Sequence, residues 1–248
     1  DEIQDFDREE IMQFINAARK CFFFFGDTAQ SIYRAFGKET LTIDQISSMT
    51  GIKVSRLYNN YRLPKPIAKI TQEYLGLTEE DNVRKYSESL YLSKENASPV
   101  FVECHSRQEQ IDCIISIIRK NKYRNVGILV PENDLVLEIM NAFTSEKFAC
   151  EFKFNAGYND YRNKDTLNFK TEYPKLMTYH SAKGLQFETV ILPFYQGASN
   201  LDEKKSLYVA MTRTYRHLYV LYNGDMLKPL KGVPERLYER MVYYPQKT

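Results

Sequence analysis

Cysteine and long apolar stretches are both scarce in this sequence. Its 248 residues include four cysteines, and none of them forms a CxxC pair or a cluster with histidine. That spacing disfavours a zinc site and is typical of a reduced intracellular protein. No apolar run approaches the ~20 residues that a membrane-spanning helix needs, and no signal peptide opens the chain. The sequence therefore predicts a cytoplasmic protein with no membrane partner. The cysteines are Cys21, Cys104, Cys113 and Cys150.

An excess of one sign of charge is also lacking. The chain has 34 Lys and Arg against 32 Asp and Glu, which leaves a net charge of +2. This balance neither requires nor excludes nucleic acid, because a local basic groove can lie on a nearly neutral protein. Apolar residues make up 43% of the chain, enough for a sizeable core and too many for wholesale disorder.

Apolar strands alternate with amphipathic helices from residue 100 onward. This alternation predicts an α/β fold whose mostly parallel sheet is covered by helices on both faces. The expected strands are 100–104, 126–130, 150–154, 175–178, 189–193 and 217–222, and the expected helices are 108–120, 134–143 and 203–212.

The first hundred residues are less regular. Asp7 and Glu10 form a capping-box pattern that predicts a helix over 8–19, and the apolar run 21–25 predicts a buried strand. A further helix is expected over 67–75, ended by Gly76. Two polar segments remain. Residues 77–98 are expected to be a linker or surface excursion, and 157–173 a solvated loop rather than a base-stacking platform.

Polar residues directly follow several expected strands, where α/β sheets bind their ligands. The pair Asp1-Glu2 suits Mg²⁺ binding and general-base chemistry, and Gln30 suits orientation of a water or contact with a terminal phosphate. Tyr61-Arg62 offers an aromatic platform beside a guanidinium. Taken singly, each of these is more typical of a solvated charge or a buried ring.

Five short motifs, taken together, are more specific than any one of them. The stretches TYHSAKGLQF (178–187) and YVAMTR (208–213) resemble motifs V and VI of superfamily 1 helicases of the UvrD/Rep/PcrA type. DEIQD (1–5), GDTAQSIY (26–33) and LYNNYR (57–62) resemble motifs II, III and IV of the same family. Five motifs in the family's order are a specific signal, whereas one short pattern has a high false-positive risk.

The resemblance implies a fold and an activity. The fold would be a RecA-like, P-loop NTPase-type parallel sheet with helices on both faces. Residues 1–56 would be a remnant of the first RecA-like domain, and 57–248 the second. The activity would be that of an ATP-dependent DNA helicase, of the kind used in DNA repair. Such an enzyme hydrolyses ATP with Mg²⁺ as it moves along single-stranded or partly duplex DNA, here expected to run 3′ to 5′.

The resemblance also implies catalytic roles for individual residues. Asp1 would hold Mg²⁺, and Glu2 would bind it as well and activate the attacking water. Gln30 would contact the γ-phosphate of ATP. Arg62 and Arg213 would be arginine fingers that reach ATP bound on the first RecA-like domain.

Other residues would bind the nucleotide or the nucleic acid. Tyr61 would stack near adenine, and the amide of Gln186 would hydrogen-bond the ribose, where the family usually has a glutamate. The backbone at Gly184 would help bind ATP, and the Lys183 side chain is expected to face solvent. The residues expected at the single strand are Tyr33, Thr178 and His180.

The chain departs from the family's pattern in one decisive way, because no GxxxxGK[ST] P-loop occurs in it. Without that nest of amides and its lysine, nothing would cradle the β- and γ-phosphates. We therefore expect a C-terminal part that is inactive without the N-terminal part of the same helicase. A smaller departure is Ala35-Phe36, where the family has an aromatic residue and an arginine. The alternative is a non-catalytic nucleic-acid-binding or regulatory module with a decayed helicase fold.

Overall fold

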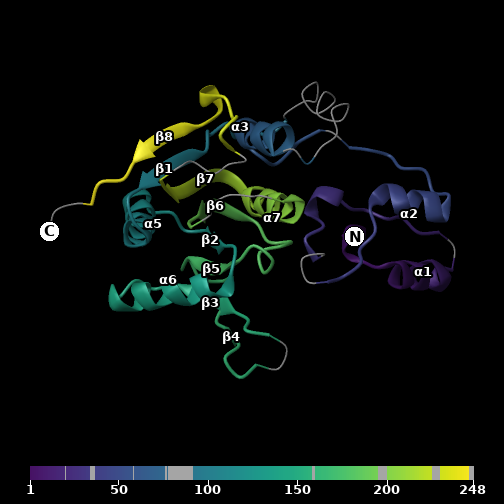
Figure 1. The fold of residues 1–248 in the computed structure, drawn as a ribbon, viewed down its shortest axis with the longest axis horizontal. Coiled ribbons are helices and arrows are strands. Elements are labelled where there is room, and N and C mark those ends of the chain that lie inside the picture. Colours follow the sequence, from purple (N-terminus) through teal and green to yellow (C-terminus); the bar gives the residue numbers. More distant parts are fainter. Residues whose placement is uncertain are drawn as a thin grey trace.

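The computed structural model of the chain has one sheet with helices around it, and residues 1–57 form an N-terminal part at one side of that sheet (Figure 1). The N-terminal part contributes helices and no strand among its described residues. The structure describes residues 1–19, 21–33, 37–57, 59–75, 77, 92–157, 160–194, 200–224 and 230–245.

The sheet has eight strands in the order β4-β3-β5-β2-β6-β7-β1-β8. Every neighbouring pair is parallel except β3 and β4, which run antiparallel. The expected parallel α/β sheet is therefore confirmed. The strands are β1 (Val100–Cys104), β2 (Val126–Val130), β3 (Glu151–Phe154), β4 (Lys164–Asp165), β5 (Lys175–Thr178), β6 (Phe187–Leu192), β7 (Thr214–Asn223) and β8 (Glu239–Val242).

Helices cover both faces because side chains along each buried strand alternate between them. In β2, Ile128 and Val130 face the core beneath α5 (Arg107–Asn121) and α6 (Asn133–Ser145). Leu129 faces the opposite core, which also contains Leu207 and Ala210 of α7 (Leu201–Met211). Ile67 of α3 (Lys65–Lys69) belongs to that second core as well, so the connection from the N-terminal part is packed against the sheet.

The N-terminal part has a small core of its own, made by Ile3, Ile11 and Ile46. Asp7 and Glu10 form the expected capping box at the start of α1. The helical elements here are η1 (Ile3–Asp5), α1 (Arg8–Ala17), η2 (Thr28–Gln30) and α2 (Ile43–Thr50).

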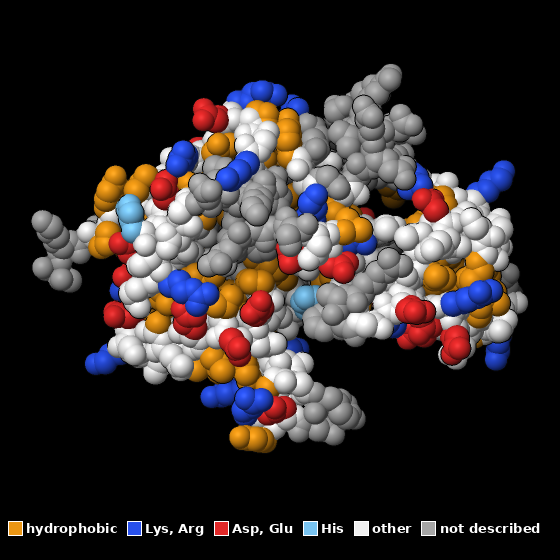
Figure 2. Space-filling model, viewed as in Figure 1, with side chains coloured by type: hydrophobic (Ala, Val, Ile, Leu, Met, Phe, Trp, Pro, Cys, Tyr) orange, Lys and Arg blue, Asp and Glu red, His pale blue; other side chains and the backbone are white. Residues whose placement is uncertain are grey.

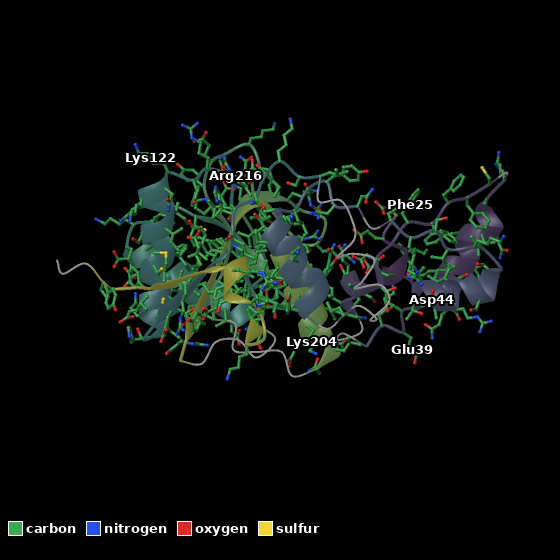
Figure 3. The ribbon with its side chains drawn as sticks, turned by 90° about the horizontal axis from the view of Figure 1, so that it is seen from above. Phe25, Glu39, Asp44, Lys122, Lys204 and Arg216 are labelled. Atoms are coloured by element: carbon green, nitrogen blue, oxygen red, sulfur yellow. The ribbon has the colours of Figure 1, made fainter. Side chains whose placement is uncertain are left out.

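The strand expected over 21–25 is absent, and that prediction is wrong. The segment has no regular secondary structure and pairs with no strand among the described residues, and Phe23 and Phe25 are 78% and 60% exposed. Its one described backbone link to the rest of this part is the hydrogen bond from Ile3 N to the Phe25 carbonyl, 3.0 Å long. Figure 3 shows Phe25 in the N-terminal part, on the opposite side of the molecule from Lys122. An apolar run becomes a strand only where a neighbouring strand can accept its hydrogen bonds.

The helix expected over 67–75 begins earlier and changes type. It starts as α3 at Lys65 and continues as one π-helical turn, η4 (Ile70–Tyr74), while Gly76 lies outside the described residues. Most of the polar excursion at 77–98 also lies outside them.

The sequence patterns did not predict α2, β4, β8 or the short η6 (Glu235–Leu237). In the described ranges, no helix is both long and apolar enough to cross a membrane.

Candidate nucleotide and nucleic-acid site

Gln30 and Arg213, predicted to meet the γ-phosphate, contact each other in the structure. Gln30 ends η2 in the N-terminal part, and Arg213 follows α7 beside the sheet. The Arg213 Nη2 donates to Gln30 Oε1 at 3.1 Å, and its Nε donates to the Val209 carbonyl at 2.9 Å. Arg213 is only 3% exposed. Burial, reinforced by the charge of Arg62, lowers the pKa of Arg213 to about 10.

Arg62, like Arg213, lies at the C-terminal end of α7. Its Nη2 donates to the Thr212 carbonyl at 3.2 Å. Its Nε is buried and has no hydrogen-bond partner among the described residues. Burial lowers the pKa of Arg62, and the nearby Tyr208 partly opposes this shift. The buried guanidinium of Arg213 and the partly buried one of Arg62, which has an unmatched donor, form a place that an anionic oxygen would complete.

Lys183 does not face solvent, so that prediction is wrong. Its side chain is 6% exposed and donates to both carboxylate oxygens of Asp5, 178 residues away in the chain. It also donates to the Gln30 carbonyl at 3.1 Å and lies 3.4 Å from a Glu2 oxygen. The sequence alone gives no sign of this contact, because Asp5 comes close to Lys183 only in the folded chain. This lysine ties the loop between β5 and β6 to the N-terminal part.

A groove runs along this ion pair, and two of the three residues predicted at the single strand, Tyr33 and His180, line it. Its lining also includes Ser181, Gly184 and the three charged residues Glu2, Asp5 and Lys183. The Tyr33 and His180 ring centroids are 6.4 Å apart. Burial lowers the pKa of His180, and the Lys183 charge adds to the effect. Thr178 is buried beneath the loop, where its Oγ1 accepts from Ser181 N at 3.3 Å.

Further members of the groove come from the end of β3 and just beyond it. Lys153 and Asn155 also line it. Acidic and basic side chains are mixed over the face of the molecule in Figure 2, with no large field of one sign. This agrees with the near-zero net charge, so a nucleic acid would be bound by a few local side chains rather than by a broad basic surface.

The remaining predicted residues are more exposed. Asp1 Oδ1 accepts from Glu2 N at 2.9 Å, and the Glu2 carboxylate accepts from the Gln4 side chain. No cluster of three or more metal-binding side chains occurs among the residues that the structure describes. Mg²⁺ in nucleotide sites is commonly held by one or two carboxylates together with phosphates and water. Asp1 and Glu2 therefore fit such a role without forming a complete cage.

Three residues predicted to bind ATP lie at the surface. Tyr61 is 70% exposed, and Gly184 and Gln186 are exposed in the loop after β5. Gly184 has a φ of +79°, in the left-handed region that glycine adopts without steric cost. The departures at Ala35 and Phe36 lie outside the described residues.

Sequence reasoning missed two residues of this site, Asp27 and Tyr208. The Asp27 carboxylate accepts from Gln30 Nε2 at 3.0 Å and from the Tyr208 hydroxyl at 3.0 Å. Both lie inside motif-like stretches, but neither stretch indicates that the two side chains meet, because 181 positions separate them.

Comparison with known proteins agrees with the motifs. Residues 175–221 match the family model of the UvrD-like helicase C-terminal domain. The ATP-dependent DNA helicase Rep of Buchnera aphidicola is 31% identical over 106 residues, which cover 36% of this chain and 15% of Rep. An uncharacterized protein of Methanocaldococcus jannaschii is 32% identical over 94 residues, which cover 32% of this chain and 8% of that protein.

A solved structure shares the fold. The C-terminal domain of a possible DNA helicase from Lactobacillus plantarum aligns with a TM-score of 0.52 at 17% identity. The alignment covers 73% of this chain and 98% of that one. The resemblance to UvrD/Rep-type helicases and the RecA-like α/β fold are thereby confirmed, while the chain spans only a small part of its curated relatives.

Proposed function

We propose that this chain, a UvrD/Rep-type helicase C-terminal domain with a short preceding segment, is the C-terminal portion of an ATP-dependent DNA translocase. Residues 57–248 act as the second RecA-like domain, and 1–56 as a remnant of the first. The observation that carries the proposal is the contact between Arg213 and Gln30, since it joins a buried cation beside the sheet to the N-terminal part. Arg62 lies at the same end of α7.

The chemistry proposed for this site is phosphoryl transfer to water. Arg62 and Arg213 stabilise negative charge that develops on the transferred phosphoryl group, and Gln30 orients the attacking water. Glu2 accepts the proton of that water. Asp1 and Glu2 would hold an Mg²⁺ ion, which would supply charge neutralisation at the phosphates. Tyr61 and Gln186 contact the base and ribose. The P-loop, absent from this sequence, comes from the N-terminal part of the same helicase.

Arg213→Ala tests the catalytic half of the proposal in a protein that joins this chain to its P-loop. Because an arginine finger stabilises the transition state, turnover is expected to fall by ~10³-fold or more while ATP binding weakens much less. Steady-state ATPase rates and nucleotide titrations measure the two effects. Arg216→Ala is the matched control, since Arg216 is an arginine of β7 that pairs with Glu188 instead. Turnover of Arg213→Ala within a few-fold of the parent would exclude the assignment.

The nucleic-acid half of the proposal rests on the groove that Tyr33 and His180 line. A single strand lying there would connect the DNA to the same loop that holds Lys183 against Asp5. Nucleotide state and DNA binding would then be coupled through the 178–187 loop.

His180→Ala in the same protein tests this coupling. Loss of one ring contact is expected to weaken single-strand binding by about tenfold, equivalent to ~1.4 kcal/mol. DNA-stimulated ATPase falls with it, whereas the unstimulated rate stays near the parent's because Gln30 and Arg213 are intact. His105→Ala, an exposed histidine after β1, is the control. Unchanged stimulation in a normally stable His180→Ala protein would rule the coupling out.

A further inference from the structure

Asp27 is a centre of hydrogen bonds between the N-terminal part and the sheet. Its backbone N donates to the Gln4 side-chain oxygen at 3.0 Å, and its Oδ1 accepts from Ala29 N at 2.9 Å at the start of η2. Its Oδ2 accepts from Gln30 Nε2 and from the Tyr208 hydroxyl, both at 3.0 Å. One carboxylate thus joins η2 to α7.

These partners determine the direction of the Gln30 amide. A carboxylate can only accept, so the Gln30 end that faces Asp27 must be the Nε2 group. A guanidinium can only donate, so the end that faces Arg213 must be Oε1. An isolated glutamine has two amide orientations of similar energy, and the hydrogen-bond network decides between them. Asp27 and Arg213 together allow one.

We infer that Asp27 is a positioning residue, which together with Tyr208 holds Gln30 with its carbonyl oxygen toward Arg213. This inference rests on the proposed function, because the direction of the Gln30 amide matters only if Gln30 acts on the nucleotide or on the attacking water. A glutamine that orients a water must present its accepting oxygen in a fixed direction. Tyr208 adds a link to the helix that ends beside Arg213, so the amide and the guanidinium are positioned by one connected group.

The first test uses this chain and needs no enzymatic activity. Asp27→Asn keeps the side chain's size and the acceptor for Ala29 N, and replaces the second acceptor oxygen with a donor. The side-chain amide signals of Gln30 in a nitrogen-15 NMR spectrum are expected to move toward those of the exposed Gln186. Tyr208→Phe is expected to shift them less and in the same direction.

A matched control removes a hydroxyl elsewhere. Tyr123→Phe breaks the 2.9 Å contact with the Tyr219 hydroxyl and is expected to leave the Gln30 signals in place. Thermal melts identify any variant that fails to fold. Should Asp27→Asn fold normally and leave the Gln30 amide signals at their parent positions, the positioning role is overturned.

The second test measures catalysis in a protein that joins this chain to its P-loop. Asp27→Asn is expected to lower kcat by roughly 10- to 100-fold, as small misplacements of reacting groups do, and to leave KM for ATP within a few-fold. An unchanged kcat in an active parent refutes the positioning inference alone. A parent without DNA-stimulated ATPase refutes the proposed function, and the NMR test then still decides whether Asp27 orients Gln30.

Discussion

Three cations lie where the N-terminal part meets the sheet, and each is compensated differently. The side chains of Lys183 and Arg213 are buried, and Arg62 is partly buried. Lys183 has a full ionic partner in Asp5. Arg213 is bonded to the neutral oxygens of Gln30, Val209 and Thr212. Arg62 has one buried nitrogen without a partner in the described part of the chain. Burying charge without an opposite charge costs several kcal/mol, so Arg213 lowers the stability of the fold, and the partly buried Arg62 does so to a smaller degree. That cost is understandable where an anion binds.

The partly buried imidazole of His180 makes stability depend on pH. Burial lowers the pKa of His180 below its ordinary value of 6.5, and Lys183 adds to this shift. Between 6.5 and the lowered folded-state pKa, the unfolded chain therefore binds more protons than the folded one. Stability contributed by neutral His180 is present above 6.5 and is lost as the pH falls through this window. Urea unfolding of the chain from pH 7.5 to 5 measures the loss.

His180→Asn isolates this contribution from that of other groups, including His217. The asparagine amide can still donate a hydrogen bond, as the imidazole does to the Ile32 backbone, but it does not titrate. We expect its unfolding free energy to fall less than the parent's over the same pH range. Parallel pH profiles for parent and variant would contradict the prediction.

At the scale of elements, both ends of the 178–187 loop are fixed by buried residues of the sheet. Thr178 closes β5 and is buried, while Phe187 opens β6 with no exposed surface. The ring of Phe187 packs over Gly127 of β2, where an added Cβ would approach its Cδ2 to 2.6 Å. A glycine in the middle of a buried strand is therefore required by a ring in the neighbouring strand.

Gly127→Ala is expected to lower the unfolding free energy by about 1–3 kcal/mol, because the methyl group overpacks the site and displaces the Phe187 ring. Urea or thermal unfolding of the chain measures the change. Gly232→Ala is the control, since a Cβ there meets no atom within 4 Å and the residue has no positive φ. Equal stability of the two variants would show that the ring and strand move apart at little cost.

At the scale of the whole molecule, the sheet region and the N-terminal part differ in how much regular structure and buried core they have. The sheet region has eight hydrogen-bonded strands and a core on each face. Among its described residues, the N-terminal part has a small buried core of Ile3, Ile11 and Ile46 and leaves Phe23 and Phe25 exposed. The residues proposed to act on the nucleotide are divided between these regions.

The isolated chain is expected to show no ATP hydrolysis above background, with or without single-stranded DNA. The physical reason is the absence of a P-loop, without which no amide nest or lysine holds the β- and γ-phosphates. A phosphate-release assay with Mg²⁺ and ATP measures this, with an active P-loop helicase as positive control. DNA-stimulated turnover by the purified chain would mean that the phosphate site has been misplaced.

The sequence by itself determined most strands and helices of the second region, although not β4 or β8. Buried strands such as 100–104 and 126–130 are short apolar runs bounded by turns, and their bounds agree with the structure. Helices such as α5 have a clear apolar face and a serine cap. These signals lie within each segment, so they can be recognised without knowing which other segments pack against it. The order of the motifs likewise indicated the helicase family without any coordinates.

Only the tertiary structure decided which remote segments meet. The run 21–25 has the composition of a strand, but no described strand pairs with it, and Phe23 and Phe25 are exposed. Lys183 reads as a solvated loop lysine, but folding brings Asp5 to it across 178 positions. Asp27 meets Tyr208 across 181 positions in the same way. A hydrogen bond or ion pair depends on distances of about 3 Å between atoms, and local sequence patterns carry no information on distances between remote segments.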